Sequence, residues 1–177
     1  MLRLIKNKKV PGAEGAFAIV ASTYNSRYVD SMVAAAKGEL KRAGVKTIQI
    51  LRVPGAFEIP LVAARLAESA ANHQLVSAIV CLGVILRGET VHAAHIGEAV
   101  SRALMQIQLQ YGIPVIHEVL LLENEEQARV RCLGRKHNRG AEAAQTALAM
   151  ARVLERFASQ QKKRGAGFEA RSSGVTL

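Results

Sequence analysis

The segment LRGETVHAAH, residues 86–95, places several kinds of polar residue directly after an apolar run. At the start of a helix, such a turn presents backbone N–H groups, and the helix dipole adds to their attraction for an anion such as phosphate. His92 falls in the first helical turn, where an imidazole can accept and donate protons near neutral pH. Two interpretations stay open: an anion site with a proton shuttle, or a capped helix start with Thr90 as N-cap and a surface histidine.

The segment VPGAFEIP, residues 53–60, puts a Pro-Gly turn, an aromatic ring and a carboxylate directly before a predicted helix. Phe57 could cover a flat ring, and Glu58 could accept hydrogen bonds from hydroxyl or amine groups of a ligand. The alternative is a tight turn with a core phenylalanine and a glutamate that the helix dipole favours. Tyr24 and Asn25 allow the same pair of interpretations.

A basic segment lies near the end of the predicted domain. It could be a solvated face, or one of its arginines could contact a phosphate through charge-assisted hydrogen bonds. Its members are Arg129, Arg131, Arg135, Lys136 and Arg139.

Two other kinds of site are not expected near His92. His95 follows it by three residues, but no carboxylate or cysteine at ligand spacing completes a metal set. Gly83 and Gly88 have the spacing of a nucleotide-binding P-loop, but Glu89 stands where that motif requires lysine. The sequence therefore predicts neither a metal site nor nucleotide hydrolysis.

The elements that position these segments alternate along the chain. Continuous apolar runs predict buried strands, and apolar residues at helical spacing predict helices between them. Strands are expected at 16–22, 45–53, 77–86 and 114–122, and helices at 27–44, 60–71, 95–112, 123–133 and 141–159. This order predicts a three-layer α/β/α sandwich around a four-stranded parallel sheet. Each polar segment follows a strand, so all lie at the carboxyl edge, where open parallel sheets bind ligands.

Composition narrows the function classes. Of the net charge of +10, an excess of three positive charges falls in residues 1–16 and another three in 161–177. The remaining surface mixes both signs and lacks interleaved aromatics, so nucleic-acid binding is not expected. Neither a secretory signal nor a membrane-spanning stretch is expected, and two cysteines are too few for a disulfide framework, which favours a cytoplasmic protein.

The expected organisation is a basic N-terminal segment at 1–14, one domain at 15–160, and a flexible basic tail at 161–177 that is rich in Gly and Ser. Cys81 lies in a continuous apolar run and is expected in the core, whereas the role of Cys132 stays open.

Taken together, VPGAFEIP, LGVILRGETVH and ENEEQARVRCLGRKHNRGAEAA closely resemble the lumazine synthase family over residues 15–158. The resemblance implies a flavodoxin-like fold and condensation of 5-amino-6-ribitylaminouracil with 3,4-dihydroxy-2-butanone 4-phosphate. The products are 6,7-dimethyl-8-ribityllumazine, phosphate and water, in the penultimate step of riboflavin biosynthesis. No cofactor is implied.

Positions that match the family's motifs imply roles. His92 would be the acid/base residue. Glu89 and Thr90 would cradle phosphate, which Arg131 would reach from a neighbouring subunit. His117 stands where the family often has a phenylalanine that stacks on the substrate from the adjacent subunit. The resemblance assigns the pyrimidine and its ribityl chain to Tyr24, Asn25, Ala56, Phe57, Glu58, Val84, Ile85 and Leu86.

Some positions depart from the family. Ala93 and Ala94 replace an aromatic and an acidic residue, and Leu121 and Leu122 replace small hydroxyl residues. With His117, these changes leave a second hypothesis, a binding or shell-forming relative without turnover. A third is a flavin carrier with a flavodoxin-like fold.

The resemblance also implies a homo-oligomer, a pentamer that in some members builds an icosahedral shell, with riboflavin synthase as a partner. No nucleic acid or membrane is implied.

Overall fold

The computed structural model describes residues 15–73, 76–134 and 137–172, with the backbone alone beyond residue 161. The predicted basic segment at 1–14 and the basic residues Arg135 and Lys136 lie outside the described residues. Four parallel strands form one sheet in the order β2-β1-β3-β4. Their bounds are Ala16–Ser22 for β1, Thr47–Val53 for β2, Ala78–Leu86 for β3 and Val115–Leu122 for β4. The predicted parallel α/β sheet is therefore confirmed.

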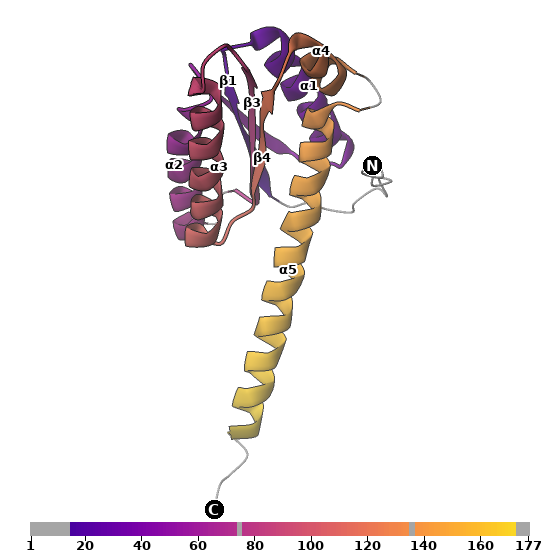
Figure 1. Cartoon of the computed structure of the whole chain (residues 1–177). Coiled ribbons are helices and arrows are strands. Elements are labelled where there is room, and N and C mark those ends of the chain that lie inside the picture. Colours follow the sequence, from indigo (N-terminus) through magenta and orange to yellow (C-terminus); the bar gives the residue numbers. More distant parts are fainter. Residues whose placement is uncertain (1–14, 74–75, 135–136, 173–177) are drawn as a thin grey trace, which may run out of the picture.

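Helices cover both faces of the sheet (Figure 1). On one face lie α2 (Ile59–His73) and α3 (His92–Tyr111); on the other lie α1 (Ser26–Arg42), the short α4 (Glu125–Ala128) and α5 (Arg139–Ser172). Two apolar clusters fill the spaces between the layers. The three-layer sandwich is thus the observed architecture.

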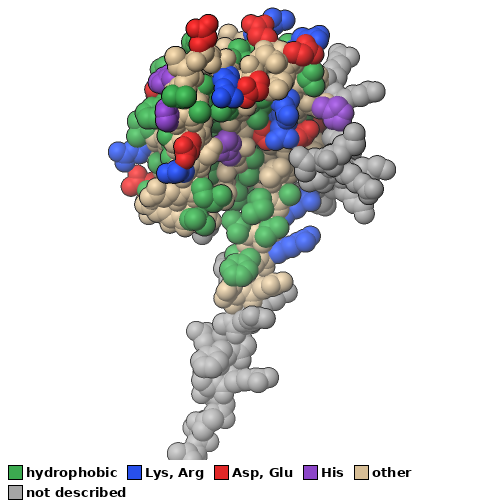
Figure 2. All heavy atoms as spheres, viewed as in Figure 1, with side chains coloured by type: hydrophobic (Ala, Val, Ile, Leu, Met, Phe, Trp, Pro, Cys, Tyr) green, Lys and Arg blue, Asp and Glu red, His purple; other side chains and the backbone are tan. Residues whose placement is uncertain are grey.

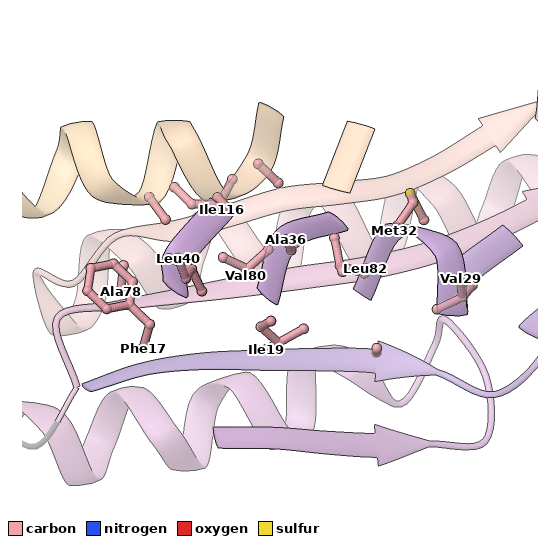
Figure 3. Close-up of a cluster of buried hydrophobic side chains, with 14 of the residues drawn as sticks. Phe17, Ile19, Val29, Met32, Ala36, Leu40, Ala78, Val80, Leu82 and Ile116 are labelled. Carbon is pink, nitrogen blue, oxygen red and sulfur yellow. The ribbon is translucent and has the colours of Figure 1, made fainter. Parts of the chain in front are cut away.

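The central strands are apolar on both sides because both of their faces are covered. On the α1 side, Phe17 and Ile19 of β1 and Val80 of β3 pack against Met32 and Leu40 of α1 (Figure 3). All five side chains are fully buried. Cys81 points into the other cluster, so its prediction as a core residue is confirmed.

Two predicted elements differ from the structure. The helix expected at 123–133 is divided into α4 and a π-helical turn, η1, at Arg129–Leu133. The segment from residue 161, which was expected to be a flexible tail, is helical as far as Ser172, because α5 continues to that residue. Lys, Arg, Gln, Ala and Glu dominate this stretch, and their helix propensity outweighs two glycines that each cost roughly 1 kcal/mol relative to alanine. Figure 1 shows α5 extending well beyond the rest of the domain, and Figure 2 shows exposed hydrophobic side chains where it leaves the domain.

The crossing of α1 and α5 is unusually close. A Cβ on Gly140 would overlap the backbone of Met32, so only glycine fits there. Beside it, the carbonyl of Cys132 accepts hydrogen bonds from Ser31 Oγ, at 2.7 Å, and from Asn138 Nδ2. Asn138 Oδ1 also accepts from the Gly140 amide at 2.9 Å. These contacts fix the end of η1 against both helices.

Candidate active site

An open cavity of about 870 Å³ lies at the carboxyl ends of β1, β2 and β3. The loops after these strands and the first turns of α3 form its walls. The site residues predicted from these segments line it, apart from Glu89, which is exposed but does not line the cavity. The lining residues include Tyr24, Asn25, Ala56, Phe57, Glu58, Val84, Ile85, Leu86, Thr90 and His92.

Asn25 connects two walls of this cavity, the loop after β1 and the end of β3. Its backbone is left-handed, with φ of 55°, a conformation that asparagine tolerates better than most residues. Its side-chain Nδ2 donates a hydrogen bond to the Val84 carbonyl at 2.8 Å. The side-chain amide therefore holds the end of β3 beside the loop after β1, and one of its donors is used within the protein.

The turn after β2 is closed by its own glutamate. The Gly55 amide donates to Glu58 Oε2 at 2.8 Å, while the Ile59 amide donates to the Ala56 carbonyl at 3.3 Å. This compact turn leaves the Phe57 ring 62% exposed, and the Tyr24 ring on the adjoining loop is 71% exposed. Two aromatic rings are thus available at the cavity for contact with a flat ring system.

The start of α3 supplies the histidine. The helix begins at His92, with Val91 rather than Thr90 at the N-cap, and the Val91 side chain makes no capping hydrogen bond. Thr90 Oγ1 accepts from the His92 amide at 3.4 Å, a long contact, so Thr90 acts only weakly as a cap. The imidazole of His92 is exposed and lines the cavity. An acid/base group thus stands at a helix N-terminus that favours anions.

The sequence reasoning missed part of this wall. Further along α3, His95, Ile96 and Ala99 also line the cavity. Their spacing from His92 follows the helical period, which would have placed them on the same face. Buried Ala93 lies there as well, where a larger residue would narrow the space.

His117 on β4 lies outside this cavity. Its Nε2 is 2.8 Å from Ser101 Oγ on α3, and that hydroxyl also donates to the Gly97 carbonyl at 2.7 Å. Partial burial against α3 lowers the pKa of the imidazole. A neutral ring is therefore favoured, and its outer face is left for other contacts.

Arg131 also lies outside it, on η1, behind the opposite face of the sheet. It lines a second cavity of about 420 Å³ together with Glu126, Gln127, Val130, His137, Arg139 and Glu142. Its guanidinium is exposed. Within one subunit, the structure does not bring Arg131 together with His92.

Buried charge beside Arg131 was not predicted. Glu118 on β4 is only 7% exposed and receives two hydrogen bonds from Arg139, at 2.7 and 3.0 Å. Arg139 also donates to Glu142 at 2.7 Å. Burial raises the pKa of the Glu118 carboxyl, and the nearby Arg139 opposes that rise. The signal in the sequence was a lone acidic residue inside the apolar strand VIHEVLLL.

Comparison with known proteins decides the family. Residues 14–155 match the family model described as 6,7-dimethyl-8-ribityllumazine synthase. A 6,7-dimethyl-8-ribityllumazine synthase from Stenotrophomonas maltophilia is 44% identical over 143 residues, covering 80% of this chain and 90% of the relative. One from Xanthomonas euvesicatoria is 40% identical over 141 residues, covering 78% and 89%.

The chain belongs to the 6,7-dimethyl-8-ribityllumazine synthase family. Its activity is therefore lumazine synthase activity in riboflavin biosynthesis, and the resemblance found in the sequence is confirmed. Enzymatic turnover, rather than a shell without activity or a flavin carrier, is the function that membership supports.

Two further observations bear on this lumazine synthase. Among the described residues, no group of three or more His, Cys, Asp or Glu side chains is arranged to hold a metal ion. In the same part of the chain, no helix is both long and apolar enough to cross a membrane.

Proposed function

We propose that the cavity at the ends of β1, β2 and β3 binds 5-amino-6-ribitylaminouracil and the phosphate-bearing butanone for condensation. The observation that carries this proposal is the convergence of two exposed aromatic rings, the Glu58 turn and His92 on one cavity. Tyr24 and Phe57 contact the pyrimidine, and the backbone of Val84 to Leu86 aligns its edge. Glu58 accepts hydrogen bonds from the ribityl chain.

The chemistry requires proton transfer at each step. The substrate amine attacks the ketone, and loss of water gives an imine. Phosphate then leaves by elimination, and the resulting enol tautomerises to a carbonyl. The ribityl-bearing nitrogen attacks this carbonyl, and loss of a second water closes the ring and completes the lumazine. His92 accepts and returns protons during these steps, while Glu89, Thr90 and the N-terminus of α3 hold the phosphate.

Arg131 completes the phosphate site from an adjacent copy of the chain. The separation of Arg131 and His92 into different cavities supports this arrangement, because one subunit alone leaves the phosphate without its arginine. Exposed apolar side chains on α3 and β4, Met105, Leu109 and Leu121, support burial between subunits. The imidazole of His117, from the same neighbouring subunit as Arg131, stacks on the substrate.

The assembly we propose is a homopentamer, with a shell of pentamers as its larger form and riboflavin synthase as its partner. We place the protein in the cytoplasm. Free thiols at both Cys81 and Cys132 support a reducing compartment.

Shared sites can be tested by mixing two inactive variants. His92→Ala and Arg131→Ala are each expected to slow lumazine formation, the first by about 10²- to 10⁴-fold. In co-assembled 1:1 mixtures, about a quarter of the sites regain both residues if each site lies between neighbours. Absorbance of the lumazine product is followed and corrected for the uncatalysed condensation.

The matched control is Arg129→Ala, which removes an arginine from the same turn that pairs with Glu126 at 2.7 Å. It is expected to leave activity unchanged. Co-assembled mixtures that stay as inactive as their parents would refute the shared site, and full activity of His92→Ala would remove that residue from the mechanism.

A further inference from the structure

The buried ion pair between β4 and α5 restrains one arginine at two points. Arg139 Nε donates to Glu118 Oε2 at 3.0 Å and its NH2 donates to Oε1 at 2.7 Å, a bidentate contact that fixes the plane of the guanidinium. The third nitrogen, NH1, donates to Glu142 at 2.7 Å. Every nitrogen of this guanidinium is thus engaged by a carboxylate.

Arg139 nevertheless lines the same cavity as Arg131. The two arginines differ in what holds them: no ion pair in the described part of the chain includes Arg131, which is exposed, whereas Arg139 is paired twice. One guanidinium against two carboxylates leaves this cluster with one excess negative charge. That charge repels a phosphate dianion held by Arg131.

We propose that Glu118 is a specificity-determining residue that holds Arg139 away from the phosphate, so that Arg131 alone binds it. Glu118 thereby keeps the affinity for the phosphate-bearing substrate, and for the phosphate product, lower than two arginines would give. This inference rests on the proposed role of Arg131. Glu118 thus affects the affinity for the butanone phosphate and leaves the affinity for the pyrimidine unchanged.

Removal of the Glu118 charge frees Nε and one terminal nitrogen of Arg139 and leaves Arg139 paired only with Glu142. The isosteric change Glu118→Gln is expected to lower the inhibition constant of inorganic phosphate and the KM of the butanone phosphate by about threefold to tenfold, the size expected for one charge near a partly solvated anion. The KM of the pyrimidine stays unchanged.

Glu142→Gln separates restraint from charge, and a double variant tests whether the gain requires Arg139. Glu142→Gln removes the same charge but keeps the bidentate grip of Glu118, so its effect on phosphate inhibition is expected to be clearly smaller. The double change Glu118→Gln with Arg139→Gln keeps the net charge of the cluster. It is expected to restore the phosphate inhibition constant of the parent protein, because the gain in Glu118→Gln comes from Arg139.

The experiment measures phosphate inhibition and both KM values on the full-length assembled protein, with melting temperature recorded for each variant. Equal effects of Glu118→Gln and Glu142→Gln would overturn the restraint, as would a gain that survives in the double variant. If Glu118→Gln does not fold, Glu118→Asp decides, because its shorter carboxylate keeps the charge but cannot keep the bidentate grip on Arg139: stronger phosphate inhibition supports the restraint, and an unchanged value overturns it. In the double variant, phosphate inhibition tenfold weaker than in the parent would show that Arg139 already binds phosphate, which also overturns the proposal.

Arg131→Gln in the same assay tests the proposed function separately. Unchanged phosphate inhibition in that variant contradicts the role of Arg131. Failure of the proposed Arg131 role shows in Arg131→Gln, whereas failure of the Glu118 restraint shows in Glu118→Gln with Arg131 intact. The two failures can therefore be distinguished.

Discussion

Asn25 holds two walls of the active-site cavity together, and its replacement should loosen both. Asn25→Ala removes the 2.8 Å hydrogen bond to the Val84 carbonyl and places alanine at φ of 55°. A part-buried neutral hydrogen bond is worth about 0.5–1.5 kcal/mol. A non-glycine residue without a tolerant side chain costs roughly another 1–2 kcal/mol in this conformation. The expected loss of unfolding free energy is therefore about 2–3 kcal/mol.

Asn25→Gly separates the two contributions. Glycine adopts positive φ freely, so this variant loses the hydrogen bond but gains no strain, and a loss of about 1–2 kcal/mol is expected, including the greater freedom of glycine in the unfolded chain. Both variants should raise the KM of the pyrimidine, because Val84 lines the cavity that we propose binds it. The KM of the butanone phosphate should change less.

Urea unfolding and steady-state kinetics on the assembled protein measure both effects. Equal stability of the alanine and glycine variants would refute the strain argument. A pyrimidine KM that stays at the parent value in both variants would show that the Asn25 contact does not shape the binding wall.

The remaining predictions concern packing and the thiols. Gly140→Ala should strongly destabilise the protein, because its Cβ would overlap the Met32 backbone. Gly38→Ala on α1, which has open space around it, should be neutral or stabilising by up to about 1 kcal/mol. Equal melting temperatures of the two variants would contradict the close crossing of α1 and α5. Burial raises the pKa of Cys132 to about 11 and also raises that of Cys81, so neither thiol should react quickly with a disulfide reagent at neutral pH until the protein is denatured; rapid labelling of the native protein would show that Cys132 is accessible.

The sequence carried enough to predict the sheet and the edge of it at which the candidate site residues meet. Runs such as AIVCLGVIL are typical of strands buried on both faces, and the polar segments after parallel strands share one edge. Tyr24, Phe57, Glu58 and His92 accordingly lie on one cavity. Local periodicity was sufficient to predict these elements, because the spacing of apolar residues in each one shows which of its faces is buried.

Hydrogen-bond partners could not be predicted in the same way. Asn25 was expected to bind a ligand, yet its amide is bonded to a carbonyl 59 residues away. Glu118 was not predicted to belong to an ion-pair cluster, although Arg139 pairs with both Glu118 and Glu142. Such pairings depend on how distant elements are placed after folding, which no local pattern records.

The sequence by itself determined the strands, the helices between them and the chemical types of residue at the carboxyl edge, because burial periodicity and turn chemistry are local properties. Only the tertiary structure decided that Arg131 opens to a different cavity from His92, and that Arg139 is held by Glu118 instead of being free. The physical reason is that the direction of a side chain and the charge around it are set by packing between layers that lie far apart in the chain.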